Sequence, residues 1–273
     1  MSLSTTMFSR KYYAAAAVGI AIFAIFGSQT ISNTVSIVTQ GLQRWAGTIT
    51  SPHPDTHAYQ VQFFSRDPLV LYIDSFLSSD EIAHVLKISE GHYEPSSVYN
   101  NNDISINLQA RVSESAIVPR DQVVRRIEKR AAKLMGWRGN HTRLQPLKVQ
   151  RYGPGGFYTF HYDWDALVED GNRATTFMIY LVADCTGGGT NFPRLAVPED
   201  ARWCGVIECG EGRDGYEGVT FRPVAGSAVY WENIHPNGTL HLGVRHASLP
   251  VREGVKVGLN IWSWDDAWRK PGV

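Results

Sequence analysis

The alternation of strand-like runs and turn residues from Leu144 onward is the sequence feature that limits the fold most. Short runs rich in β-branched and aromatic residues alternate there with clusters of Gly, Pro and Asn, and the runs include LKVQRY, TTFMIYLV, GVTFRPV, SAVYW and VKVGLNIWSW. Runs of this length between turn residues are typical of antiparallel strands in a sandwich or barrel. We therefore expect residues 144–266 to form a β core.

Helices are predicted ahead of this core. Ser78 stands three residues before Glu81, which is the capping-box pattern at the start of a helix. A second helix is expected from about Pro119 to Leu134, where apolar residues recur at helical spacing. With a strand at Leu69–Ile73, residues 67–143 are predicted to be an N-terminal α/β support region, and the whole body is of the α+β class.

The N-terminus holds a segment suited to a membrane. Residues 12–31 carry no charge and have about the length of a bilayer-spanning helix, which needs ~17–25 residues. Arg10 and Lys11 precede the segment, so residues 1–11 are predicted to be a cytosolic tail and the segment a signal anchor. A cleaved signal peptide is the alternative. Residues 32–66 are expected to form a linker.

Glycosylation sequons and cysteines are consistent with a location of the residues after the anchor in the lumen of the endoplasmic reticulum. Sequons begin at Asn140 and Asn237. Two of the three cysteines, Cys185, Cys204 and Cys209, could pair in an oxidising compartment, and the sequence leaves open which two, or whether all three stay reduced. We therefore expect a single-pass type II membrane protein with a lumenal body.

The charge balance bears on the partners. The chain has 26 Lys plus Arg and 26 Asp plus Glu, so its formal charge is zero. A surface that binds nucleic acid normally carries a net positive field. We therefore expect no nucleic-acid partner.

A His-x-Asp pair is the first candidate metal site. His161 and Asp163 are two residues apart, so on a strand they share one face and can reach one ion. His235, His241 and His246 are candidates for a third ligand. Two His and one carboxylate leave coordination positions open, as non-haem Fe(II) oxygenases require, but a zinc hydrolase could use the same set.

Seven blocks in chain order resemble the catalytic domain of the prolyl 4-hydroxylase family of Fe(II)/2-oxoglutarate dioxygenases. They include QRYGPGGFYTFHYD, RATTFMIYL, GGTNFP and GSAVYWENIHPNG, and together they span about residues 67–264. The family also places a Lys ten residues after its distal His, and here 256 − 246 = 10. The resemblance implies a double-stranded β-helix (jelly-roll) core with supporting helices, preceded in this chain by one transmembrane helix.

The resemblance also assigns roles to seven positions. It gives iron to His161, Asp163 and His246, 2-oxoglutarate to Tyr152, Thr190 and Lys256, and a catalytic role near the metal or the substrate to Tyr158. On this assignment His235 and His241 are loop or neighbouring residues rather than ligands.

The implied activity is hydroxylation of an aliphatic C–H bond, with Fe(II), 2-oxoglutarate, dioxygen and ascorbate, most simply on prolyl residues of proteins. A free amino acid or secondary metabolite is an alternative substrate, and an inactive binding module or a zinc hydrolase an alternative function. The substrate stays open because Val257 replaces a common Trp of the family and residues 194–222 form a long insertion. Residues 99–108 are expected to form a mobile lid, and candidate substrate-stacking aromatics are Tyr99, Trp231, Trp262 and Trp264.

Overall fold

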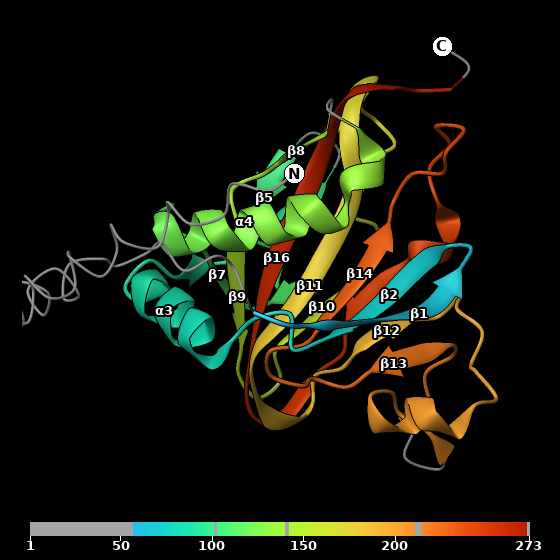
Figure 1. The fold of residues 1–273 in the computed structure, drawn as a ribbon. Helices are drawn as coiled ribbons and strands as arrows, with labels where there is room; N and C mark the ends of the chain where they lie inside the picture. Colours follow the sequence, from blue (N-terminus) through green and yellow to red (C-terminus); the bar gives the residue numbers. More distant parts are fainter. Residues whose placement is uncertain (1–56, 101–102, 140–141, 211–214, 272–273) are drawn as a thin grey trace, which may run out of the picture. The chain divides into compact units, whose positions relative to one another are not determined.

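The computed structural model describes residues 57–100, 103–139, 142–210 and 215–271 (Figure 1). The predicted tail, the anchor at 12–31, most of the linker and Asn140 lie outside these residues. Within the described part of the chain, no helix is both long enough and apolar enough to cross a bilayer.

The described strands form two sheets and one separate hairpin, and every pairing is antiparallel. The larger sheet has nine strands in the order β1 (Gln60–Arg66), β2 (Leu69–Asp74), β14 (Ala228–Glu232), β11 (Asp170–Gly187), β16 (Val251–Arg269), β9 (Lys148–Tyr152), β7 (Glu114–Ile117) and β3 (Glu94–Pro95), with β8 (Thr142–Leu144) paired to β16. The smaller sheet has five, in the order β13 (Val219–Phe221), β12 (Thr190–Phe192), β15 (His246–Ser248), β10 (Phe157–His161) and β6 (Arg111–Val112). This mostly β core is consistent with the predicted jelly roll.

Two α-helices begin where side chains cap them. α3 (Ser79–Ser89) starts with the predicted capping box, in which the Glu81 N–H donates to Ser78 Oγ (3.2 Å) and the Ser78 N–H to the Glu81 carboxylate (3.0 Å). α4 (Gln122–Leu134) begins three residues later than predicted, because the Asp121 carboxylate accepts from the Val124 N–H (2.9 Å) and fixes the first turn there. Short 3₁₀ helices span Gly136–Arg138 (η1), Ala201–Gly205 (η2) and Leu242–Val244 (η4).

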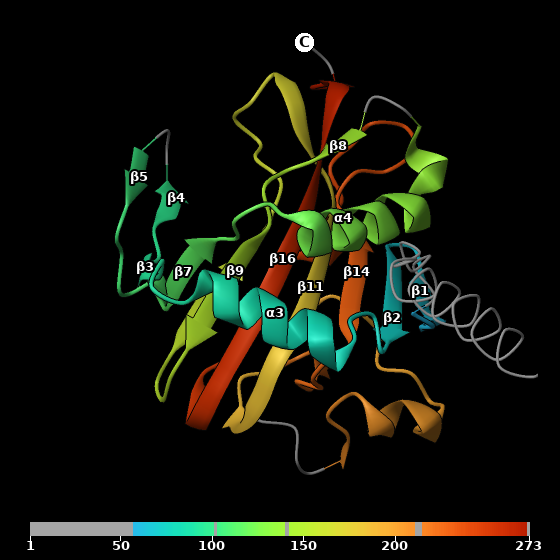
Figure 2. The ribbon, with the colours of Figure 1, turned by 60° about the vertical axis from the view of Figure 1, so that its left-hand side comes forward.

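The central strands of the larger sheet are buried on both faces. Figures 1 and 2 show α3 and α4 lying across one face, over β9, β16, β11 and β14. Alternate residues of β11 serve the two sides: Phe177 and Ile179 pack with the helices, whereas Met178 and Tyr180 pack toward the smaller sheet. The continuous apolar run in β11 therefore reflects burial on both faces, and the second face forms the floor of the site described below.

The predicted linker over 32–66 is wrong at its end. Gln60–Arg66 form β1, an edge strand of the larger sheet, rather than a tether. Phe64 provides the physical reason, because its ring packs edge-on against Trp203 (4.8 Å between centroids) and Phe221 (4.9 Å). Most other side chains of this strand face solvent, so the sequence carries little apolar alternation to reveal it.

The insertion at 194–222 is tied to the core. It contains η2, the strand β13 and a disulfide between Cys204 and Cys209, which leaves Cys185 as the free, half-buried thiol. Trp203 is buried beside the disulfide and packs with Phe64 of β1. The insertion therefore supports the edge strand.

The segment expected to form a mobile lid, 99–108, contains most of a β-hairpin. β4 (Val98–Asn100) and β5 (Asp103–Ser105) pair with each other and with neither large sheet. The hairpin therefore projects from the body as a separate flap (Figure 2).

The contact between the helices provides a stability test. Arg130 of α4 and Glu81 of α3 form a buried bidentate pair (2.8 and 2.9 Å). We expect Glu81→Ala to lower the free energy of unfolding by about 3–5 kcal/mol, because the buried guanidinium loses its carboxylate. Denaturant titration measures this change. Asp266→Ala is the matched control, since its pair with Arg143 is solvent-exposed and should contribute less than about 1 kcal/mol. Equal losses in the two variants would contradict the expectation.

Candidate metal centre and cosubstrate pocket

Pairing between two strands of the smaller sheet builds the metal centre. In the β10–β15 ladder His161 lies directly opposite His246, and Asp163 follows two residues after His161. Nε2 of His161 lies 3.9 Å from Asp163 Oδ1, and Nε2 of His246 lies 3.8 Å from Asp163 Oδ2. The three donor atoms are all within 4.8 Å of one another, so a single ion can contact all of them.

Backbone carbonyls orient both imidazoles. Nδ1 of His161 lies 2.8 Å from Thr159 O, and Nδ1 of His246 lies 3.0 Å from Val244 O. Each ring thus carries its proton on Nδ1, which leaves the Nε2 lone pair directed at the centre. Burial, together with the neighbouring His246, lowers the pKa of His161 to about 3, so this ring is neutral at physiological pH.

A chain of hydrogen bonds holds the carboxylate. Thr176 Oγ1 donates to Asp163 Oδ2 (2.7 Å), and Asn233 Nδ2 donates to Thr176 Oγ1 (3.0 Å). The Arg173 guanidinium donates to the Asp163 carbonyl oxygen (3.2 Å). Since Asp163 is buried, these bonds fix its orientation, and the donor set of two imidazoles and one carboxylate fits Fe(II).

The larger sheet contributes the cosubstrate end of the site. Lys256 of β16 pairs with Tyr152 of β9, and its Nζ lies 4.5 Å from the Tyr152 ring centre. The Lys256 side chain is fully buried, and Nζ donates to Gly188 O (2.6 Å) and to Ser248 Oγ. The Tyr152 hydroxyl donates to Gln150 Oε1 (2.9 Å), so its proton is directed at Gln150.

The surroundings of Lys256 fit a dicarboxylate. Its two acceptors are neutral, and none of the ion pairs among the described residues involves it. Burial lowers the pKa of Lys256 to about 7. A buried ammonium in this setting is stabilised by an incoming carboxylate. The pocket therefore has the charge that 2-oxoglutarate requires.

The other two predicted residues also lie in the site. Thr190 is buried, pairs with Ser248 across β12 and β15, and its Oγ1 accepts from the Tyr180 hydroxyl (2.8 Å). Tyr158 stacks on His161 with 3.6 Å between ring centres. Thr190 thus forms part of the pocket wall, while Tyr158 covers the His161 ring.

All seven predicted residues line one cavity of about 750 Å³. The side chains of His235 and His241, rejected on spacing, gather elsewhere with Asp67. The cavity opens at exposed apolar side chains, Ile104 of β5, Ile117 of β7 and Leu167. The structure thus brings together residues spread over more than a hundred positions of the sequence.

Sequence reasoning missed three residues that support the candidate site. Ser248 contacts Lys256, and its place two residues after His246 on one strand face is the signal that was available. Thr176 holds Asp163 from within an apolar run that gives no functional signal. Arg111 is 5% exposed, its guanidinium carbon lies 4.6 Å from the Tyr158 ring centre, and its Nη2 has no partner among the described residues.

Comparisons with known proteins indicate the family of the chain. Residues 147–264 match the model of the 2OG-Fe(II) oxygenase superfamily. "Probable prolyl 4-hydroxylase 7" of Arabidopsis thaliana is 29% identical over 215 residues, covering 74% of this chain and 65% of the relative. "Probable prolyl 4-hydroxylase 6" of the same plant is 30% identical over 213 residues, covering 72% of this chain and 69% of the relative.

Longer relatives and a solved structure share the same region. The prolyl 4-hydroxylase subunit alpha-1 of Gallus gallus is 29% identical over 210 residues, so that 73% of this chain matches only 36% of the relative. The viral collagen prolyl hydroxylase of Paramecium Bursaria Chlorella virus-1, solved with 2OG, superposes with a TM-score of 0.52 at 23% identity, covering 71% of this chain and 95% of that one. The likeness to the viral enzyme shows a shared fold.

The buried Lys256 predicts a pH dependence for 2-oxoglutarate binding. Its free-state pKa is lowered to about 7, so above pH 7 the ammonium must regain a proton before it can pair with a carboxylate. We expect the 2-oxoglutarate dissociation constant to rise as the pH increases above 7, by up to about tenfold per unit. Anaerobic calorimetry with saturating metal measures it.

Lys256→Arg is the matched control, because a guanidinium keeps its charge over this range. Its dissociation constant should change less with pH, even if binding is weaker at every pH. Titration of metal ligands would change the dissociation constant equally in both proteins, so a difference between their pH profiles reports on Lys256. Identical pH profiles for the two proteins would contradict the assignment of this dependence to Lys256.

Proposed function

Because the chain belongs to the prolyl 4-hydroxylase family of 2-oxoglutarate- and Fe(II)-dependent oxygenases, we propose that it hydroxylates prolyl residues within peptides or proteins. The cavity carries this proposal. It extends from the metal-ligand cluster to exposed apolar side chains at its opening, so a substrate can reach the centre while the rest of it stays outside.

The protein groups have separate tasks in the reaction. His161, Asp163 and His246 hold the ion, and Lys256 receives the far carboxylate of 2-oxoglutarate. When bound, Fe(II) and 2-oxoglutarate supply the oxidising chemistry, in which dioxygen and 2-oxoglutarate give succinate and carbon dioxide while a C–H bond becomes C–OH. The protein orients these partners and keeps water away.

Aromatic packing excludes water from the distal ligand. The ring centre of Trp231 lies 4.6 Å from that of His246, and the centre of Phe192 lies 5.5 Å from it. Both aromatic side chains are almost completely buried. These aromatic side chains keep water away from His246, which strengthens electrostatic interactions at the centre.

The rim favours a peptide over a free amino acid. Ile104, Ile117 and Leu167 are 69%, 55% and 56% exposed, and all three line the cavity. A free amino acid at the metal would leave these side chains in water, whereas flanking residues of a peptide would cover them. Arg111 adds an unpartnered buried donor that a backbone carbonyl of the substrate can satisfy.

The rim predicts the outcome of a substrate assay. We expect a proline-rich peptide to stimulate succinate release more than free proline does, with mass spectrometry locating one added oxygen on a prolyl residue. Ile104→Ser should raise the peptide KM by about three- to tenfold and leave kcat unchanged, because partial burial of one aliphatic side chain contributes about 1 kcal/mol.

Ile106→Ser is the matched control, since Ile106 is 59% exposed but does not line the cavity. It should leave the peptide KM unchanged. Stimulation by free amino acids but not by any proline-rich peptide would overturn the peptide assignment. Ascorbate belongs to the same proposal, as the reductant that restores iron oxidised in uncoupled turnovers, and omitting it should shorten the linear phase of the assay.

We also propose that the enzyme is anchored in the membrane of the endoplasmic reticulum through residues 12–31, with its catalytic domain in the lumen. The uncharged segment after Arg10 and Lys11 supports this placement. The Cys204–Cys209 disulfide suits an oxidising compartment. Asn237, the first residue of a sequon, is exposed and therefore accessible to glycosylation.

Glycosylation tests this placement. Expressed in eukaryotic cells, the full chain should resist alkaline extraction from membranes and shift in mobility after endoglycosidase treatment. Asn237→Gln should remove the part of that shift due to this site, because Thr239 then lacks its acceptor asparagine. Recovery of an unglycosylated chain in the soluble fraction would overturn the proposal.

A further inference from the structure

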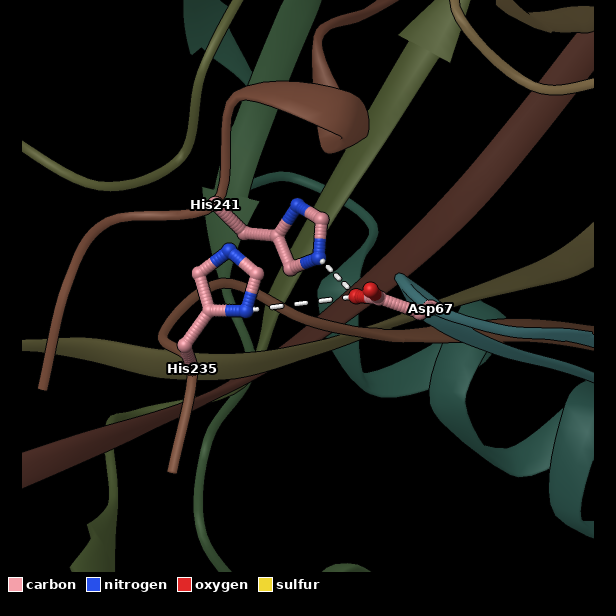
Figure 3. A group of neighbouring side chains, drawn as sticks. All are labelled: Asp67, His235 and His241. Atoms are coloured by element: carbon pink, nitrogen blue, oxygen red, sulfur yellow. Dashed lines mark hydrogen bonds and ion pairs between the residues drawn. The ribbon is translucent and has the colours of Figure 1, made fainter. Parts of the chain in front are cut away.

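A second cluster of metal-binding side chains lies outside the catalytic centre. Asp67, in the turn between β1 and β2, meets His235 and His241, which belong to the loop after β14. Figure 3 shows the Asp67 carboxylate facing one nitrogen of each imidazole. His241 Nε2 lies 2.9 Å from Asp67 Oδ1, and His235 Nδ1 lies 3.9 Å from the same oxygen.

The loop after β14 is folded so that it presents both imidazoles together. The His241 N–H donates to Asn233 O (2.8 Å) and the His235 N–H to Thr239 O (2.8 Å), with a bridge between Ile234 and Leu240. In such a hairpin His235 and His241 occupy diagonal positions on one face. Their rings stack with 3.7 Å between centres and an angle of 21° between planes.

Burial beneath the hairpin fixes its position. Ile234 is 2% exposed and packs in a small apolar cluster with Ala174 and Trp268. The other face carries the two imidazoles, of which the His241 side chain is 10% exposed and that of His235 is 32% exposed. The Asp67 side chain is 81% exposed, so its carboxylate can adjust to an ion without disturbing the core.

We propose that Asp67, His235 and His241 form a binding site for Zn²⁺, distinct from the catalytic iron centre. Two imidazole nitrogens and one carboxylate oxygen are ligands that Zn²⁺ takes, with water completing a tetrahedron. The three donor atoms lie within 4.8 Å of one another. Because the two rings are stacked, the more exposed His235 ring must turn out of the stack to direct its lone pair at the ion. The exposed side of Asp67 leaves room for the water.

Binding requires a change of tautomer at His241. The Gly243 N–H donates to His241 Nδ1 (3.2 Å), so in the metal-free protein the ring proton lies on Nε2 and is donated to Asp67. Zn²⁺ takes the Nε2 lone pair once this proton has moved through solvent to Nδ1. The hydrogen bond from Gly243 is then lost, and its amide, in a partly exposed turn beside the exposed Leu242, is hydrated instead.

The site would tie the β1–β2 turn to the segment that leads into His246. A Cβ placed on Gly243 would lie 3.1 Å from both Pro68 Cδ and His241 Cε1, so the turn, the ring and the loop are already in contact. The Trp164 indole also donates to His241 O (3.2 Å). An ion that links Asp67 to His241 would therefore stabilise the segment that leads from His241 to His246, without contacting the catalytic centre itself.

Zinc stoichiometry tests the proposal while separating the two sites. In equilibrium dialysis of the full chain with micromolar Zn²⁺, followed by elemental analysis, a His161→Ala/His246→Ala variant should still bind one ion per chain. Adding His235→Ala and His241→Ala should remove that ion. Adding His92→Ala instead should not, because His92 is an exposed histidine that belongs to neither cluster.

A second measurement uses protein in which the proposed ligands are intact. Nitrogen-15 spectra of the histidine rings should show His241 protonated on Nε2 without metal and on Nδ1 with Zn²⁺, with a shift of His235 Nδ1 at the same concentration. Loss of zinc binding on removal of the catalytic pair alone, or rings of His235 and His241 that do not respond to Zn²⁺, would overturn the proposal. The substrate of the enzyme has no bearing on either measurement.

Discussion

The pairing of β10 with β15 is the constraint on which the site depends. It sets His161 opposite His246 across one antiparallel ladder, although 85 residues separate them in the sequence (246 − 161 = 85). Adjacent strands lie about 4.8 Å apart, so a cross-strand pair on one face is spaced for a shared ligand. A register shift by one residue would turn His246 to the other face of the sheet, and the metal centre would be lost.

The two sheets divide the chemistry between them. The smaller sheet carries the candidate metal ligands His161 and His246, and Asp163 follows two residues after the end of β10. β16 of the larger sheet carries Lys256 into the space between the layers. Placing an ammonium there has a free-energy cost, as its lowered pKa shows. Burial of apolar side chains on both faces of β11, with helices on one face and the inter-sheet core on the other, stabilises the fold and offsets this cost.

Prediction from the sequence worked where local chemistry is strong. Ser78 and Glu81 predicted the start of α3. The ten-residue interval from His246 to Lys256 favoured His246 over His235 and His241 as the third candidate metal ligand. Prediction failed at β1, where most side chains face solvent. The mobile lid expected over 99–108 stays a prediction, and part of that segment is the β4–β5 hairpin. The Asp67 cluster was beyond reach because its members meet only when the β1–β2 turn folds onto the loop after β14.

The sequence by itself predicted both helices and most of the core strands, and it indicated the family and the candidate site residues, because alternation, capping and fixed intervals are properties of a few neighbouring positions. The tertiary structure decided which cysteines pair, that Thr176 and Asn233 hold Asp163, and that Arg111 lies over Tyr158. These are contacts between distant segments. Strand register and layer packing set them, and neither can be read from one stretch of the chain.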